Sequence, residues 1–262
     1  MTKAEKRRQR KLRRQERRQA KQNQGEIQVL DDQKAKYEEY KLEWFRPTER
    51  QLDIVYGMSS SPCTLVQGGS GCGKSTTAIW QALKMLKAGH YSKIVFIKTP
   101  SEDGDDQIGF LTGDSNQKLT VHLDAMRSIF HTFMSQNKLA MEEKRGRIEF
   151  TIPNFIAGKT FYNALIIVDE AQKISLSTLK LILERFDDSS NIVLLGDKGQ
   201  TYSAKKREDG FTRLVRLVTD VDENGRYSVE NMIHYVELTS KDNQRGKFSK
   251  RIGEIFEELE GQ

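Results

Sequence analysis

The sequence has no long apolar run and only two cysteines. No stretch approaches the ~20 consecutive apolar residues that a membrane helix needs, and the amino terminus carries charge where a signal peptide has an apolar region. Cys63 and Cys72 are nine residues apart, or ~30 Å when extended at ~3.3 Å per residue, which is beyond disulfide reach. We therefore expect reduced thiols, no membrane segment and a cytoplasmic location.

Positive charge is concentrated at the amino terminus. The 262-residue chain has a formal net charge of +6, but residues 1–21 hold eleven Lys or Arg against two Glu, so the remainder carries −3. Residues 1–24 lack Gly and Pro and have almost no apolar residues, so helix is locally allowed but has no face to bury. We predict a basic arm over residues 1–24, disordered or helical, then a linker over 25–42 and one domain over 43–262.

The rest of the chain alternates short apolar runs with helical patterns. This alternation predicts an α/β fold with a mostly parallel sheet and helices on both faces. Strands are expected at residues 63–67, 93–99, 165–169, 191–195 and 235–238, with an edge strand or hairpin at 147–152. Helices are expected at residues 74–87, 118–134, 175–185, 211–217 and 250–259.

A glycine-rich loop follows the first predicted strand. Residues 68–75 match the G-x-x-x-x-G-K-[ST] pattern, with an apolar strand before them and a helical pattern after them. Such glycines let backbone N–H groups point at phosphate oxygens, the Lys bridges the β- and γ-phosphates, and the Ser hydroxyl ligates Mg²⁺. We predict a site for ATP with Mg²⁺, formed by Gly68, Gly69, Ser70, Gly71, Cys72, Gly73, Lys74, Ser75 and Thr76.

Two further strands end in polar residues. Asp169 and Glu170 follow the apolar run at 165–168, where they would lie at the carboxyl edge of the sheet. We predict that Asp169 holds Mg²⁺ together with Ser75 and that Glu170 is the general base for the attacking water. Gln200, four residues after Gly196, could orient that water or contact the γ-phosphate, because its amide is both donor and acceptor. Gly-Asp after a strand is also an ordinary turn.

Two other patterns do not indicate a site. Residues 158–160 read Gly-Lys-Thr, but the first glycine of a second phosphate loop would fall at Pro153. The four histidines are scattered without the spacing of a metal site, so we assign them to the surface or to packing.

Taken together, these motifs resemble the PhoH-like family of single-domain ATPases of bacteria and bacteriophages. The similarity extends over most of residues 47–257. It also includes Thr-x-x-Gln at 48–51, Gly-Phe-Leu-Thr-Gly-Asp at 109–114 followed by Lys118, Asp-Glu-Ala-Gln at 169–172, Gly-Asp-x-x-Gln at 196–200 and Asp-x-x-Arg at 242–245. The sequence departs from the family at Lys98-Thr99-Pro100, where an Arg-Pro is usual, at Thr112, where a Pro is usual, and at 157–160, where Lys159 alone keeps the basic character.

The resemblance implies a RecA-like P-loop NTPase fold related to superfamily-1 helicases. It implies that Gln51 reads the adenine edge and that Arg245 reaches the triphosphate, either within its own subunit or across an interface, with Arg185 and Lys159 as the other candidates. It also implies a homo-oligomeric ring, a hexamer in this family, and the host cytoplasm if the chain is phage-encoded.

The function predicted from these features is ATP hydrolysis coupled to nucleic acid. Eleven cations on the arm would give strong, salt-sensitive binding without sequence preference, to RNA or to single-stranded DNA, with RNA favoured. Alternatively, the arm keeps the protein soluble or contacts an acidic protein. The competing functions are a small-molecule or nucleotide kinase, which shares the phosphate loop, and a nucleotide-gated scaffold with little turnover.

Overall fold

The computed structural model describes residues 34–99, 115–200, 210–219 and 232–260. The basic arm, the first part of the linker and the segment at 109–114 therefore lie outside the described residues. The side chain of Lys118 is also outside them, although its backbone belongs to a helix.

A parallel six-stranded sheet forms the centre of the molecule, in the order β3-β2-β4-β5-β1-β6. Its strands are buried apolar runs, as parallel strands covered on both faces require. They are β1 (Cys63–Gln67), β2 (Lys93–Lys98), β3 (Ile148–Thr151), β4 (Ala164–Asp169), β5 (Asn191–Gly196) and β6 (Ile233–Glu237). All of the strands expected from the sequence are present, and β3 is an edge strand that pairs in parallel with β2 rather than a hairpin.

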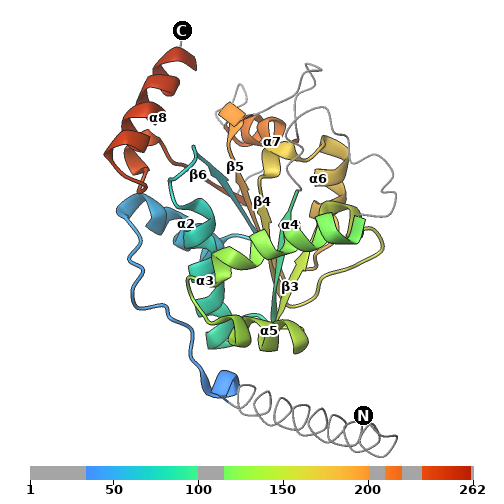
Figure 1. Ribbon diagram of the computed structural model, residues 1–262. Helices are drawn as coiled ribbons and strands as arrows, with labels where there is room; N and C mark the ends of the chain where they lie inside the picture. The colour runs from blue at the N-terminus through green and yellow to red at the C-terminus, as the bar shows by residue number, and fades with distance from the viewer. Residues whose placement is uncertain (1–33, 100–114, 201–209, 220–231, 261–262) are drawn as a thin grey trace, which may run out of the picture.

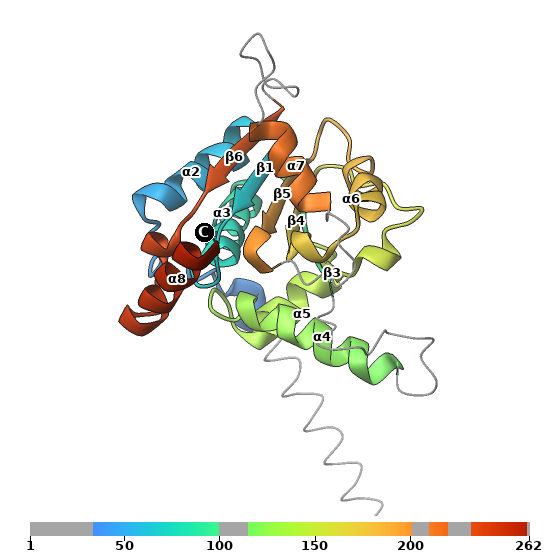
Figure 2. The same ribbon diagram turned by 90° about the horizontal axis from the view of Figure 1, so that it is seen from above.

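Helices cover both faces of this sheet (Figures 1 and 2). One apolar cluster joins a face of the sheet to α2 (Glu49–Ser60), α3 (Lys74–Ala88), α4 (Ser115–Phe130) and α5 (Gln136–Lys144). A second cluster joins the other face to α6 (Leu176–Leu183) and α7 (Gly210–Thr219). Because β5 separates the strand that enters the phosphate loop from the strand that ends in Asp169, the sheet has the predicted RecA-like P-loop arrangement.

Two of these helices are missing from the sequence prediction. In α2, Gly57 and the two β-branched residues Ile54 and Val55 weaken the helical pattern. Thr48 and Gln51 nevertheless form a capping box at its start. In α5, the residues are mostly polar, but the Ser135 side chain caps the backbone N–H of Lys138. Tertiary packing and capping therefore determine that these two segments are helical, because intrinsic helix propensity alone does not.

Residues 34–47 form a strap that runs along α3 to the phosphate loop (Figure 1). Glu39 pairs with Lys87 near the end of α3, at 2.6 Å, and the Trp80 indole donates to the Leu42 carbonyl at 3.0 Å. Tyr40 and Leu42 are buried. The last part of the predicted linker thus belongs to the packed body, because its apolar side chains cover α3 and α5.

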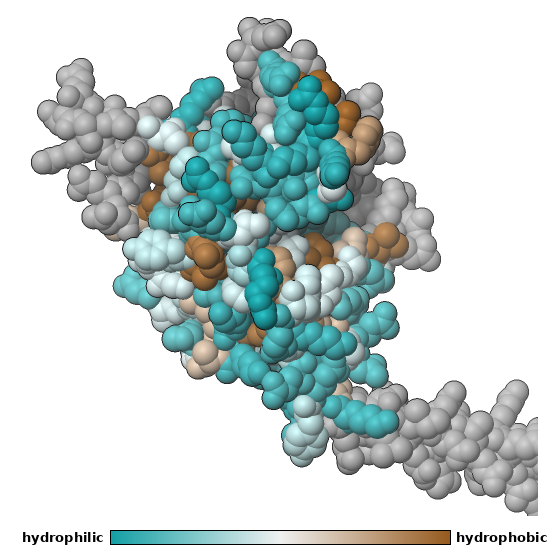
Figure 3. Space-filling view, turned by 90° about the vertical axis from the view of Figure 1, so that its left-hand side faces the viewer, coloured by the Kyte–Doolittle hydropathy of each residue, from teal (hydrophilic) through white to brown (hydrophobic). Residues whose placement is uncertain are grey.

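The carboxyl-terminal helix α8 (Lys247–Glu260) packs on the short helix η4 (Ser240–Asp242). Figure 3 shows the side of the molecule that carries α2 and α8, where hydrophilic side chains dominate and hydrophobic patches are small. Phe248 is 82% exposed and Leu52 is half exposed. No helix in the described part of the chain is both long and apolar enough to cross a membrane.

Candidate nucleotide site

The phosphate loop lies between β1 and the first turn of α3. Gly71 and Gly73 adopt positive φ angles of 88° and 76°, a region that glycine enters without strain. A Cβ on Gly73 would come within 2.6 Å of the Gln51 amide nitrogen. The loop therefore needs glycine there both for its backbone and for the close approach of α2, and α3 directs its unpaired backbone N–H groups into the loop.

Within the loop, the Lys74 ammonium donates to the carbonyls of Gly68 and Gly69, the latter at 2.9 Å. Gln51 holds the loop from outside, because its amide nitrogen donates to the Cys72 carbonyl at 3.0 Å. The amide oxygen of Gln51 accepts from the Thr48 backbone N–H, and the residue is only 2% exposed. Its visible role is to tie α2 to the loop, and adenine recognition by Gln51 stays a prediction.

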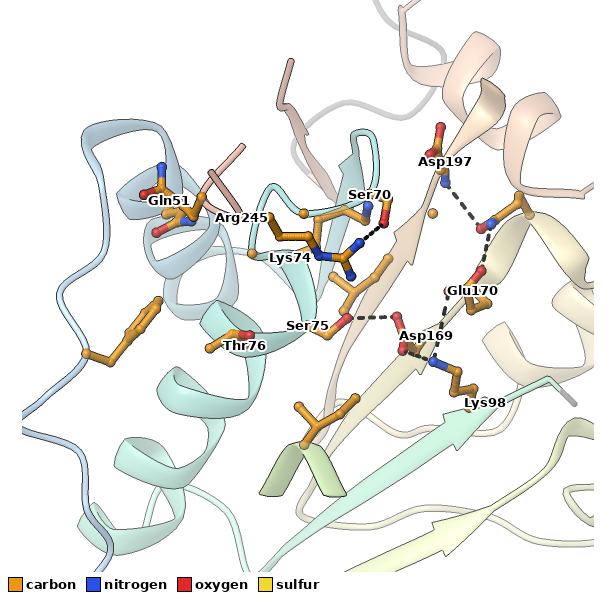
Figure 4. Close-up of a pocket in the computed structure, with 18 of the residues that line it drawn as sticks. Gln51, Ser70, Lys74, Ser75, Thr76, Lys98, Asp169, Glu170, Asp197 and Arg245 are labelled. Carbon is orange, nitrogen blue, oxygen red and sulfur yellow. Dashed lines mark hydrogen bonds and ion pairs between the residues drawn. The ribbon is translucent and has the colours of Figure 1, made fainter. Parts of the chain in front are cut away.

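The two carboxylates predicted from the sequence lie at the mouth of this loop (Figure 4). Asp169 ends β4 and is 4% exposed, and the Ser75 hydroxyl donates to its Oδ1 at 2.9 Å. A hydroxyl beside a buried carboxylate offers the hard oxygen ligands that Mg²⁺ prefers. No larger group of metal-binding side chains occurs among the described residues, and Mg²⁺ in phosphate sites commonly needs only one or two protein ligands. Ser75 and Asp169 therefore fit a magnesium ion.

Glu170 follows Asp169 with a left-handed backbone, φ 57° and ψ 42°. That conformation is uncommon for a residue with a side chain, and it turns the chain sharply at the end of β4. Gln172 donates to Glu170 Oε2 at 2.9 Å, while its own amide oxygen accepts from the Asp197 backbone N–H at 3.2 Å. Gln172 thus links the Glu170 carboxylate to the backbone just after β5.

Lys98 is a site residue that the sequence marks only as a departure from the family. It ends β2, and its ammonium lies 2.8 Å from Asp169 Oδ2 and 3.9 Å from Glu170 Oε1. The His122 ring lies 3.2 Å from the Lys98 carbonyl, and burial lowers its pKa below the usual value. The signal that could have found Lys98 is its place at a strand end on the edge that carries the carboxylates.

Gln200 ends the short helix η3 (Lys198–Gln200) that follows β5. Its side chain lies outside the described part of the structure, so its predicted role with water stays a prediction. Asp197, just before this helix, lines the cleft and accepts from the Gly199 backbone N–H at 3.0 Å. The turn after β5 therefore reaches the site, as its position on the edge predicts.

Arg245 reaches the phosphate loop of its own chain. Its guanidinium donates to the Ser70 hydroxyl at 2.9 Å, and the preceding Gln244 N–H donates to the Gly71 carbonyl at 3.0 Å. The other candidates, Arg185 and Lys159, are not among the described residues that line the cleft. Lys159 instead pairs with Glu149 on the edge strand, at 2.7 Å.

These groups line one cleft of about 480 Å³. Its phosphate end carries the loop, the strand-end carboxylates and Arg245, and its other end is lined by Trp44, Phe45 and Ile129. Trp44 stacks on Phe133 with ring centroids 5.4 Å apart, yet 54% of Trp44 is exposed. These aromatic residues were not predicted from the sequence, because they precede the first expected element.

Comparison with known proteins supports the resemblance found in the sequence. The profile of the PhoH family, described as PhoH-like protein, matches residues 46–257. The chain belongs to the PhoH-like family. The predicted membership is therefore confirmed, and it extends over the phosphate loop, both strand-end motifs and the segment that carries Arg245.

Curated PhoH-like proteins are similar over much of the chain. One from Synechocystis sp. is 26% identical over 213 residues, which is 81% of this chain and 62% of the relative. One from Bacillus subtilis is 27% identical over 67% of this chain and 54% of its own length. Protein PhoH from Escherichia coli K12 is 27% identical over 57% of this chain and 42% of its own length. The chain thus spans roughly half the length of these relatives.

Solved structures with a similar arrangement include the helicase domain of Pyrococcus furiosus Hef. That domain is 16% identical, with a TM-score of 0.46 over 79% of this chain and 41% of its own chain. A large terminase ATPase domain from Thermus phage P74-26 is also 16% identical, with a TM-score of 0.43 over 77% of this chain and 84% of that chain.

Proposed function

We propose that this PhoH-like protein binds ATP with Mg²⁺ and hydrolyses the γ-phosphate. The observation that carries the proposal is the hydrogen bond between Ser75 of the phosphate loop and Asp169 at the end of β4. It brings the two parts of a triphosphate site, the loop and a strand-end carboxylate, into one cleft. Glu170 lies next to them, in a place suited to a base that acts on water.

Each residue has a distinct part in this proposal. The Lys74 ammonium, which now donates to carbonyls of its own loop, turns to the β- and γ-phosphates. Ser75 and Asp169 hold Mg²⁺, which when bound neutralises charge on the phosphate oxygens. Glu170 takes the proton of the attacking water, and Gln172 keeps its carboxylate in place. Arg245, already on the loop through Ser70, adds positive charge at the triphosphate.

ATP turnover with and without RNA tests the proposed hydrolysis. We expect magnesium-dependent release of phosphate, with RNA raising the rate more than single-stranded DNA does. If ATP is consumed only when a small-molecule or nucleotide acceptor is present, the protein is a kinase. If ATP binds but no ADP forms under any condition, the scaffold interpretation replaces the ATPase.

The nucleic-acid partner is supported by the charge of the basic arm, which is +9 over residues 1–21. Deleting residues 1–24 should leave basal ATP turnover unchanged, because the cleft begins at Trp44. Affinity for RNA should fall, and its salt dependence should flatten by about 0.7–0.9 log unit of slope for each phosphate that the arm no longer neutralises. If the truncated protein binds RNA with the same affinity and the same salt dependence, the arm serves solubility and does not bind RNA.

Assembly into a closed ring, a hexamer by family resemblance, also belongs to this proposal. The contact between Arg245 and its own loop favours an arginine that acts within its subunit. We expect light scattering to show a ring. Because Arg245 contacts its own loop, mixed Lys74→Ala and Arg245→Ala subunits should regain no activity after reassembly. Recovered activity would show that Arg245 acts on the nucleotide of a neighbouring subunit. A fully active monomer would contradict the proposed ring.

A further inference from the structure

Lys98 and Asp169 are brought together by the register of the sheet. β2 and β4 are neighbours, and these two residues are direct partners at the ends of their strands. The Lys98 ammonium lies 2.8 Å from Asp169 Oδ2, so the pair is a close ion pair (Figure 4). Because both residues belong to sheet strands, their pairing does not depend on the conformation of a loop.

The environment of Asp169 makes a positive partner necessary. Its side chain is 6% exposed, and a buried carboxylate without a counter-charge is strongly destabilising. The Ser75 hydroxyl occupies the other carboxylate oxygen, at 2.9 Å, but it is neutral. Lys98 therefore supplies the positive charge that balances this buried carboxylate.

We propose that Lys98 is a positioning residue that competes with the divalent cation for Asp169. This inference rests on the proposed function, in which Asp169 and Ser75 hold Mg²⁺. Two cations that share one largely buried carboxylate repel each other. Glu170, whose Oε1 lies 3.9 Å from the ammonium, is the carboxylate left to receive Lys98 when the metal binds.

The competition has a consequence for the order of events in the cleft. While Lys98 pairs with Asp169, its positive charge opposes binding of a metal ion at that carboxylate. Arrival of metal with nucleotide moves the ammonium toward Oε1 of Glu170. Lys173 lies on the other side of that carboxylate, 3.6 Å from Oε2. Lys98 thus lowers the affinity for metal alone and favours metal that arrives with phosphate charge beside it.

Binding of Mn²⁺ alone, followed by electron paramagnetic resonance, tests this competition without nucleotide. Lys98→Met keeps the length of the side chain and removes its charge, so it should bind Mn²⁺ about tenfold more tightly, within the roughly 5–150-fold range of coupled binding events. Lys98→Arg, which keeps the charge, should stay within a few-fold of the parent. Adding Asp169→Asn to Lys98→Met should abolish the gain. Equal or weaker Mn²⁺ binding by Lys98→Met would overturn the proposal.

A second measurement uses the unmodified protein and so does not depend on the variant folding. Labelling of lysine amines, mapped by mass spectrometry, should rise at Lys98 when Mg²⁺ is added without nucleotide at a concentration high enough to saturate the site, because the ammonium then leaves its 2.8 Å contact with Asp169. Lys87, which pairs with Glu39 far from the cleft, is the internal control and should not change. Labelling of Lys98 that is unaffected by Mg²⁺ would contradict the competition.

The two proposals can fail separately. A protein that turns over no ATP but shows the Lys98 effect on Mn²⁺ refutes the ATPase alone. A protein that hydrolyses ATP while Lys98→Met leaves Mn²⁺ binding unchanged refutes the competition alone. Weaker binding of ATP by Lys98→Met, with Mn²⁺ binding unchanged, would identify Lys98 as a phosphate contact instead.

Discussion

The two ends of the cleft are built in different ways. At the phosphate end, side chains come from the loop after β1 and from the ends of β2, β4 and β5, and they bond to one another, as Ser75, Asp169 and Lys98 do. At the other end, Trp44 and Phe45 come from the strap, outside the sheet, and they contact other aromatic side chains. The phosphate end is thus fixed by strand register, whereas the strap end depends on how one irregular segment packs.

This difference predicts where substitutions will abolish chemistry and where they will only adjust affinity. Changes at the phosphate end should act on turnover or on triphosphate binding in general. Changes at the strap end should affect the affinity for the base of the nucleotide and the packing of the strap. Four single substitutions test that division.

Glu170→Gln should lower ATP turnover by about 10²–10⁴-fold, the usual effect of losing a general base. ATP binding should stay close to the parent, because the amide keeps the shape of the side chain. Single-turnover hydrolysis and binding of a fluorescent ATP analogue measure the two quantities. Glu184→Gln, on an exposed residue at the end of α6, is the matched control. Parent-like turnover by Glu170→Gln would exclude it as the base.

Lys74→Ala should weaken ATP binding by about ten- to a hundredfold, because a charged hydrogen bond contributes roughly 1.5–3 kcal/mol. Lys74 begins α3 and belongs to neither apolar cluster, so the fold should be retained. Calorimetric titration with ATP and with inorganic tripolyphosphate should show the same loss for both. A loss confined to ATP would place Lys74 at the base rather than at the phosphates.

Gln51→Ala should destabilise the protein by about 1 kcal/mol, the typical effect of losing a helix cap. The substitution also removes the bond from α2 to the Cys72 carbonyl. Thermal denaturation measures the loss, and Thr48→Ala, which removes the other half of the capping box, is the comparison. If Gln51→Ala weakens ATP binding far more than Thr48→Ala does, the adenine role is supported.

Trp44→Ala should weaken ATP binding only a few-fold, since an aromatic contact contributes about 0.5–1.5 kcal/mol. Binding of tripolyphosphate, which lacks a base, should not change. Tyr37→Ala removes an exposed aromatic ring of the same strap that does not line the cleft, and it should affect neither ligand. Equal losses for both ligands would show that the two ends of the cleft are not independent.

The phosphate end was predictable because its chemistry is tied to short, spaced patterns. Buried parallel strands read as apolar runs, and the residue after each run must lie on the ligand-binding edge. Asp169 and Glu170 follow such a run, and both line the cleft. The strap end was not predictable, because Trp44 lies in a turn of a segment without helical or strand periodicity. The Thr-x-x-Gln at 48–51 suggests an adenine contact through the family resemblance, while the structure shows the cap of α2.

Lys98 illustrates a different limit. Its position at the end of a strand was visible in the sequence, but its partner depends on which strands are neighbours. Strand order is a non-local property, and only the pairing of β2 with β4 brings Lys98 beside Asp169. An ion pair between residues 71 positions apart leaves no local pattern in the chain.

The strap also sets where a partner of the basic arm is held. Its first described residues lie near the end of α3 at Lys87, and its last reach the phosphate loop, so it spans a helix of 15 residues, or about 22 Å. A nucleic acid bound by the arm, as proposed above, would be tethered to the body of the protein through this packed strap. Tethering converts a second contact into an intramolecular event with an effective concentration in the millimolar range for short links. A site on the surface beside the cleft would then be occupied most of the time if its dissociation constant lies below that concentration.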